Sequence, residues 1–135
     1  MNRTRLIAII FTLQLLLVAS LSAEEKRFVA EIIDGVQHVE VVGSEYAFEP
    51  NLIILKLNVP VAFKAKKEGG FVPHDLIVAA PEAGMDFSLE LTSDWQVVSF
   101  TPTKVGTYPM ECLKRLLWFK SHKERGMHGV IEVVP

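Results

Sequence analysis

The side chains best suited to bind a transition metal gather in one segment near the C-terminus of the 135-residue chain. Residues 112–129 contain the only cysteine, Cys112, together with Met127 and two of the four histidines, His122 and His128. Thiolate, imidazole and thioether groups suit soft transition metals, copper first among them, better than oxygen groups do. The segment therefore predicts most of a soft-metal site, with one ligand still to come from elsewhere in the chain.

Cys112 has several interpretations in an exported protein. A single cysteine cannot form an internal disulfide, so it is an intermolecular partner, a free thiol or a metal ligand. A buried thiol without a function also fits the composition. The neighbouring histidines and methionine favour the metal-ligand interpretation.

The missing ligand has a candidate in His74, which directly follows Pro73 at the start of a β-prone run. Proline fixes its own φ and pushes Val72 toward an extended conformation, so the backbone before His74 is stiff, as a metal ligand requires. Taken alone, His74 also fits an ordinary core or loop histidine. His38 has the pattern of a plain strand residue, and Met85 that of a loop methionine used as filler.

The first residues predict a secretory signal peptide over residues 1–23. Arg3 and Arg5 precede an apolar run over residues 6–21, and small residues follow it up to Ala23. An uncleaved membrane anchor is the alternative, although the run is rather short for a spanning helix. No cysteine follows the run, so a lipoprotein signal is absent. We therefore expect a periplasmic or secreted protein with one mature domain over residues 24–135.

The composition narrows the class of protein further. The whole chain has a net charge of −2, and removal of two arginines with the signal makes the mature domain more acidic. A nucleic-acid-binding protein needs a basic face to neutralise phosphates, so this charge balance does not suggest that class. Hydrophobic residues make up 50% of the whole chain, so the mature domain can bury a single core without help from a disulfide.

The periodicity predicts an all-β fold. Asp-Gly is a strong hairpin signal between two β-prone runs, and here Asp34-Gly35 separates residues 27–33 from residues 36–42. Together with the runs that follow, about eight short strands separated by turns predict an antiparallel sandwich or barrel. The further strands are expected over residues 52–57, 61–65, 76–78, 87–91, 95–100, 107–112 and 130–134.

Three blocks of the sequence resemble the cupredoxins, small blue-copper electron carriers such as plastocyanin and azurin. Residues 73–78, followed by 81–86, are similar to the plastocyanin region that supplies the first histidine. Residues 106–112 are similar to the strand that delivers the copper thiolate. Residues 122–131 repeat the spacing of the second histidine and the axial methionine. The resemblance covers nearly all of the mature chain, and the three blocks together are more specific than any one of them.

The resemblance implies a Greek-key β-sandwich that binds one copper ion. Carried over to this sequence, it makes His74, Cys112 and His122 the strong ligands and Met127 the weak axial ligand. One thiolate and two imidazoles tolerate both Cu(I) and Cu(II), and a long axial thioether helps to set the redox potential. Such a site passes single electrons with little change in geometry.

The sequence departs from the cupredoxin pattern between Cys112 and His122. Plastocyanin and azurin have only a few residues there, whereas this chain has the nine residues 113–121. The spacing of Leu113, Leu116 and Leu117 predicts a short helix of about two turns, inserted between the two ligands. The segment must then turn back if Cys112 and His122 are to bind one ion.

Two other side chains are alternative ligands. His128 directly follows Met127, and a rearranged loop would let it replace His122 or the methionine. Glu111 offers a carboxylate, which would give a harder copper site. In a regular strand, however, Glu111 points away from Cys112.

The insertion also predicts a docking surface. Its aromatic residues lie among basic ones, which would steer an acidic redox partner toward the copper, with an apolar centre for close approach. A solvated amphipathic cap is the alternative. The residues concerned are Lys114, Arg115, Trp118, Phe119, Lys120, Lys123 and Arg125.

The leading functional hypothesis is therefore an exported copper protein that carries electrons between larger redox proteins. No paired acid and base or activated nucleophile indicates an enzyme. The alternatives are a periplasmic protein that binds or delivers copper without redox turnover, and a metal-free interaction module of the same fold. We expect a monomer that contacts a membrane only through an uncleaved signal, if at all.

Overall fold

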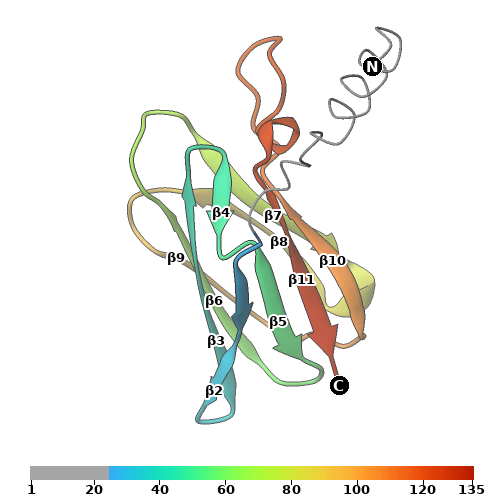
Figure 1. Cartoon of the computed structure of the whole chain (residues 1–135). Coiled ribbons are helices and arrows are strands. Elements are labelled where there is room, and N and C mark those ends of the chain that lie inside the picture. Colours follow the sequence, from blue (N-terminus) through green and yellow to red (C-terminus); the bar gives the residue numbers. More distant parts are fainter. Residues whose placement is uncertain (1–24) are drawn as a thin grey trace, which may run out of the picture.

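A computed structural model describes residues 25–135, which form two packed β-sheets (Figure 1). The predicted signal peptide lies outside these residues, so it stays a prediction. Within residues 25–135, no helix is long and apolar enough to cross a membrane.

The first sheet has six strands, and the candidate ligands lie in or next to three adjacent strands of this sheet. The central strand of these three, β10, runs antiparallel to β7 on one side and to β11 on the other. In spatial order the strands are β1 (Arg27–Val29), β5 (Leu52–Lys56), β11 (His128–Val134), β10 (Gly106–Glu111), β7 (His74–Ala80) and β8 (Met85–Leu91).

The second sheet has five strands and covers the inner face of the first. Four of them lie in the order β2 (Glu31–Ile33), β3 (Val36–Ser44), β6 (Val61–Lys67) and β9 (Gln96–Phe100), and β4 (Ala47–Glu49) pairs with β3. The other regular elements among the described residues are two short 3₁₀ helices, η1 (Pro81–Ala83) and η2 (Lys123–Arg125).

The all-β Greek-key sandwich predicted from the sequence is confirmed, with two differences in detail. The described residues form eleven strands rather than about eight. The predicted strand over residues 27–33 is divided at Ala30 into β1 and β2, which belong to different sheets, and β4 was not predicted. The Asp34-Gly35 hairpin is confirmed: both residues have positive φ, and Ile33 pairs with Val36 across the turn.

Alternation along the strands builds the core between the sheets. Side chains on opposite faces of a strand alternate, so every second residue turns inward. On β3 the inward residues are Val39 and Val41, on β5 Ile53 and Leu55, and on β6 Phe63, all fully buried. The half-buried strands that the sequence predicted thus meet in one hydrophobic cluster.

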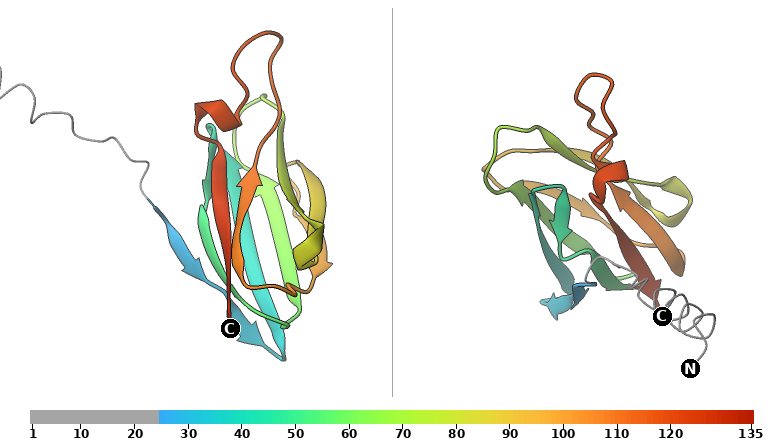
Figure 2. Two further views of the ribbon diagram at one scale, coloured as in Figure 1. Left: turned by 90° about the vertical axis from the view of Figure 1, so that its right-hand side faces the viewer. Right: turned by 45° about the horizontal axis from the view of Figure 1, so that its top comes forward.

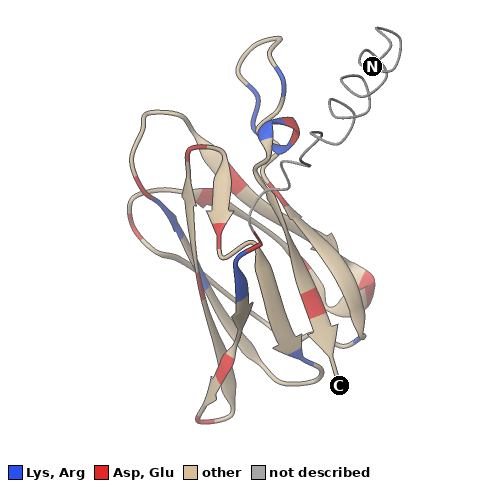
Figure 3. Cartoon of the chain, viewed as in Figure 1, with Lys and Arg blue, Asp and Glu red and all other residues tan. Residues whose placement is uncertain are grey.

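The chain between β10 and β11 leaves the sandwich at one end and returns to it. Figure 2 shows this loop projecting beyond the strands in two further views. Figure 3 shows Lys and Arg residues along the loop, and residues of both charges spread over the sandwich. The candidate ligands lie at the base of this loop.

Gln37 joins the two sheets through a buried amide. Its side chain is fully buried on β3, its Nε2 donates to the carbonyl oxygens of Lys56 and Val59 at 3.1 and 3.0 Å, and its Oε1 accepts from the backbone N–H of Lys56. A buried polar side chain that is fully hydrogen-bonded stabilises one arrangement of its neighbours. Gln37 therefore fixes β5 of one sheet relative to β3 of the other.

We expect Gln37→Leu to lower the free energy of unfolding by about 2 kcal/mol, because it leaves the part-buried backbone hydrogen-bonding groups of Lys56 and Val59 without their partner. Chemical denaturation followed by circular dichroism measures the change.

Gln96→Leu is the matched control, since the side-chain amide of half-buried Gln96 donates to Thr92 and Asp94 in hydrogen bonds that are exposed to solvent. Its effect should stay within about 0.5 kcal/mol. Equal losses in the two variants would contradict a special role for Gln37.

Candidate metal centre

Strand direction brings the candidate ligands to one end of the first sheet. His74 is the first residue of β7, Cys112 directly follows β10, and Met127 directly precedes β11. Because β10 is antiparallel to both neighbours, its end lies beside their beginnings. Residues separated by up to 53 positions in the sequence are thereby placed at one edge of the sandwich.

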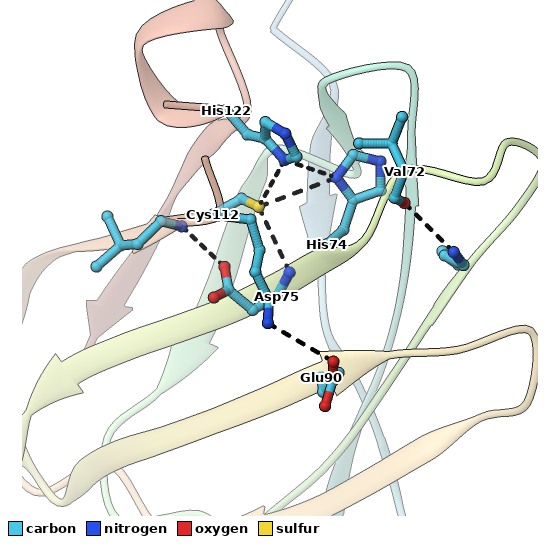
Figure 4. Close-up of polar contacts among 9 residues, drawn as sticks. Val72, His74, Asp75, Glu90, Cys112 and His122 are labelled. Atoms are coloured by element: carbon cyan, nitrogen blue, oxygen red, sulfur yellow. Dashed lines mark hydrogen bonds and ion pairs between the residues drawn. The ribbon is translucent and has the colours of Figure 1, made fainter. Parts of the chain in front are cut away.

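Three donor atoms meet there (Figure 4). The Nδ1 atoms of His74 and His122 are 3.1 Å apart, and the Sγ atom of Cys112 lies 4.0 Å from the first and 3.5 Å from the second. All three side chains are buried, and His/Cys ligand atoms of this group lie within 4.8 Å of one another.

The spacing of the donors fits a single ion. A point equidistant from the three atoms lies about 2.1 Å from each, which agrees with the roughly 2.0–2.3 Å of nitrogen–metal and sulfur–metal bonds at zinc sites. The set of one sulfur and two imidazole nitrogens is typical of trigonal copper sites. The residues present therefore fit a copper ion in both chemistry and spacing.

Asp75 holds the cysteine in place from the neighbouring strand. Its backbone N–H donates to the Sγ atom of Cys112 at 3.4 Å, and its carboxylate accepts a hydrogen bond from the backbone N–H of Leu113 at 2.8 Å. Both contacts join the start of β7 to the residues that leave β10, so the sulfur and the following peptide are oriented together (Figure 4).

The burial of Cys112 keeps its thiol neutral in the absence of a metal. Burial is the main cause that raises its pKa to about 11, and the Asp75 carboxylate adds to the increase. Backbone N–H groups of Asp75 and Lys114 favour the thiolate and offset part of this effect. A bound cation would have to displace the thiol proton, since the thiolate is the metal-binding form.

The two histidines are held in the form that binds metals. Burial lowers the pKa of His74, and the nearby His122 and Lys67 lower it further. Burial also lowers the pKa of His122, with Arg125 adding to the decrease. Both imidazoles are therefore neutral at neutral pH and have a free nitrogen lone pair to offer.

Met127 is packed beside this group by the same backbone. Its N–H donates to the carbonyl of His122 at 2.9 Å, and its own carbonyl accepts from the N–H of Cys112 at 3.1 Å. The side chain is fully buried, and a Cβ atom added at Gly43 would lie 3.1 Å from its methyl group. The absence of a side chain at Gly43 thus makes room for the thioether.

The inserted segment is a closed loop and not a helix, so the predicted short helix is wrong. Two backbone hydrogen bonds close its base, from the N–H of His122 to the carbonyl of Lys114 and from the N–H of Lys123 to the carbonyl of Cys112, both 2.9 Å long. They return His122 to Cys112 despite the nine intervening residues. The leucines with helical spacing are exposed, because no part of the core lies against them.

Local contacts shape the end of the insertion. Ser121 and Glu124 form a capping box: the Glu124 carboxylate accepts from the backbone N–H and hydroxyl of Ser121, and the Ser121 hydroxyl accepts from the N–H of Glu124. This box begins η2, which directly follows His122. The histidine is thereby fixed between the closed loop base and a helical turn.

The two alternative ligands point elsewhere. His128 is exposed at the first position of β11, where it pairs with Glu111 across the strands. The Glu111 carboxylate forms an ion pair with Lys123 at 2.7 Å. Met85, which the sequence suggested as a loop filler, is the first residue of β8 and is fully buried in the core.

Tyr46 is a neighbour of the site that sequence reasoning missed. Its ring lies edge-on to those of His74 and His122, at centroid distances of 6.0 and 4.9 Å, and the Arg125 guanidinium lies over it at 5.0 Å. It comes from the turn between β3 and β4 and has a positive φ of 65°. No signal in the sequence links this tyrosine to the histidines, since only the fold brings the turn to them.

Comparison with known proteins identifies the fold. No protein-family model matches the sequence, and no curated protein matches it significantly. Among solved structures, the chain is similar to the metal-binding domain of the Cu(I)-exporting P-type ATPase of Streptococcus pneumoniae D39, with 16% identity, TM-score 0.62, and coverage of 84% of this chain and 100% of that one.

Two further solved structures, auracyanin A and rusticyanin, show the same likeness. For auracyanin A, a "blue" copper protein of Chloroflexus aurantiacus, identity is 19%, the TM-score is 0.55, and coverage is 74% of this chain and 100% of that one. For rusticyanin of Thiobacillus ferrooxidans, identity is 15%, the TM-score is 0.59, and coverage is 84% and 85%. The chain therefore has the cupredoxin fold.

We expect Cys112 of the metal-free protein to react slowly with iodoacetamide at pH 8. With its pKa raised to about 11, about one thiol in a thousand is ionised at that pH. The rate should keep rising with pH beyond 9, because the thiolate fraction is still increasing there. Mass spectrometry of the intact chain measures the labelling, and as the only cysteine, Cys112 accounts for all of it.

The same reaction in denaturant gives the exposed-thiol control. A rate in the folded protein that levels off near pH 9, as it does for an ordinary thiol, would contradict the raised pKa.

Proposed function

We propose that this protein is an exported copper-binding protein of cupredoxin type that carries single electrons between redox partners. The observation that carries the proposal is the convergence of His74, Cys112 and His122 on one buried point at the end of the sandwich. The three residues would hold the ion, and Met127 would be the weak fourth ligand.

The donor set supports copper over harder cations. Thiolate and imidazole donors suit both oxidation states of copper, and bound copper supplies a one-electron Cu(I)/Cu(II) couple. Carboxylates, which favour harder cations, are absent from the group formed within the described residues. The chain thus presents the ligands that redox cycling of copper requires.

The backbone supports rapid electron transfer by keeping the ligands still. Cys112 is held by Asp75 and Met127, and His122 is held by the loop base and η2. Because these hydrogen bonds do not depend on the ion, the ligands keep their places when an electron is gained or lost. One electron is accepted from a reduced protein and the same electron is passed to an oxidised one, so the carrier ends each cycle unchanged.

Export and the partner belong to the same proposal. The signal peptide over residues 1–23 would deliver the mature domain, residues 24–135, to the periplasm or the exterior. A redox protein would approach the end of the sandwich where His74, Cys112 and His122 lie, since these residues would hold the copper. The expected docking residues Lys114, Arg115, Trp118, Lys120 and Lys123 all lie at this end.

A copper-handling role without redox turnover is the second candidate. It is favoured by the likeness to a metal-binding domain of a Cu(I)-exporting ATPase, which has the same fold. The burial of all three donors also suits the retention of a cation. Such a protein would bind Cu(I) and lack a stable, intensely coloured Cu(II) form.

We expect Cu(II) added to the purified protein to give an intense visible thiolate-to-copper absorption that disappears on reduction and returns on oxidation. His122→Ala should abolish this band, because it removes one of the three converging donors, and Cys112→Ser should do the same. Absorption spectroscopy with one equivalent of copper measures the effect.

His128→Ala is the control, since His128 is exposed and outside the donor group. It should leave the band intact. Loss of the band in His128→Ala but not in His122→Ala would overturn the ligand assignment, and tight binding of Cu(I) without a band in the unaltered chain would favour the copper-handling role.

A further inference from the structure

The end of the inserted loop is an apolar tip that none of the described residues 25–135 covers. The tip is Leu116, Leu117, Trp118 and Phe119, whose exposed fractions are 58%, 67%, 82% and 48%. The rings of Trp118 and Phe119 stack on each other at 6.0 Å. Four consecutive large apolar residues exposed together indicate a contact surface rather than a solvated loop.

The tip is narrow and convex. The N–H of Phe119 donates to the carbonyl of Leu116 at 3.0 Å, and Leu117 has a positive φ of 51°, so the chain reverses tightly there. The loop projects past the ends of the strands (Figures 1 and 2). A stable protein interface needs about 800 Å² on each partner, which four residues on a protruding turn do not provide.

Basic residues surround the tip. Residues 113–126 hold five of the fourteen Lys and Arg residues of the chain but one of its sixteen acidic residues. They lie on the stem of the loop and on η2, behind the tip (Figure 3). They are Lys114, Arg115, Lys120, Lys123 and Arg125.

Three of the five basic residues remain available to a ligand outside the protein, whereas Lys114 pairs with Glu90 at 3.6 Å and Arg125 lies over the ring of Tyr46. Arg115 lies 3.7 Å from Glu124, and Lys123 lies 2.7 Å from Glu111, but the side chains of both are about half exposed, at 56% and 47%. Lys120 is exposed and has no ion pair among the described residues. A segment with excess positive charge on a mildly acidic domain favours an anionic surface.

We propose that the tip inserts into the interfacial region of an anionic lipid bilayer, with the surrounding basic residues against the lipid headgroups. Tryptophan and phenylalanine favour the membrane–water interface, and each nearby Lys or Arg adds affinity for anionic lipid. Fully exposed Phe71, which lines a cavity with Arg115 and Leu116, adds a second apolar contact at this end. Trp118, which the sequence placed in the interface with a redox partner, is thereby assigned to the lipid, and the partner would meet the donor end of the domain beside the inserted tip. This membrane contact is additional to the one that the sequence allowed through an uncleaved signal.

The chain has two tryptophans, so the contact of the tip with lipid can be followed separately from the rest of the domain. Trp95→Phe leaves Trp118 as the only tryptophan, and Trp118→Phe leaves Trp95, which lies before β9 in the second sheet. Each full-length variant is mixed with vesicles of phosphatidylcholine, with or without phosphatidylglycerol, and with brominated lipids that quench indole fluorescence. Tryptophan emission is the readout and not the bound fraction, because apolar residues 6–21 can bind lipid by themselves.

We expect the emission of Trp118 to shift to shorter wavelength and to be quenched by brominated lipid in anionic vesicles, with smaller changes in neutral vesicles or high salt. The emission of Trp95 should not change. Unchanged Trp118 emission in every vesicle would overturn the proposal, as would protection of Trp118 by a protein partner in the absence of lipid, which would assign the tip to a protein groove.

A matched pair of charge changes tests the role of the basic residues. Lys120→Gln should lower the ratio of inserted to free tip about fivefold, since it removes one headgroup contact. Lys104→Gln makes the same change in the turn before β10, at the opposite end of the sandwich, and should have no effect. Equal effects of the two substitutions would overturn the assigned orientation.

Discussion

The two backbone hydrogen bonds at the base of the insertion are the contacts on which the rest of the site depends. Without them, nine residues between Cys112 and His122 would allow the histidine to lie anywhere along an extended excursion. With them, the carbonyls of Cys112 and Lys114 receive the N–H groups of Lys123 and His122, and the chain re-enters the site where it left. The two hydrogen bonds therefore keep His122 beside Cys112, although nine residues lie between them.

Burial has opposite chemical effects on the two kinds of donor. It disfavours the charged forms of both, so the thiol keeps its proton while the imidazoles lose theirs. The resulting site is electrically neutral inside a low-dielectric edge of the sandwich. A cation that binds there displaces the proton of the Cys112 thiol and is then held by an anionic sulfur. Neither histidine has to ionise for this.

The sequence was sufficient for the fold and for the residues that meet, and insufficient for how they are held. Alternation, the Asp34-Gly35 turn and the spacing around Cys112 depend on local chemistry, which a sequence displays directly. The helix predicted over residues 113–121 failed because leucine spacing reports amphipathicity and does not report whether a core is present to receive the apolar face. Tyr46 and the backbone contacts of Asp75 were missed because they arise from strand pairing between distant residues.

The closed base of the insertion also divides this segment into residues that fix the donors and residues that do not. Residues that hold the donors are tied to strand ends and to each other, so a change in any of them disturbs the rest. The part of the loop beyond the two closing hydrogen bonds does not hold the donors. Its length and composition can therefore change by mutation or recombination without moving them. In this chain the geometry of the donors and the composition of the loop tip can therefore change independently of each other.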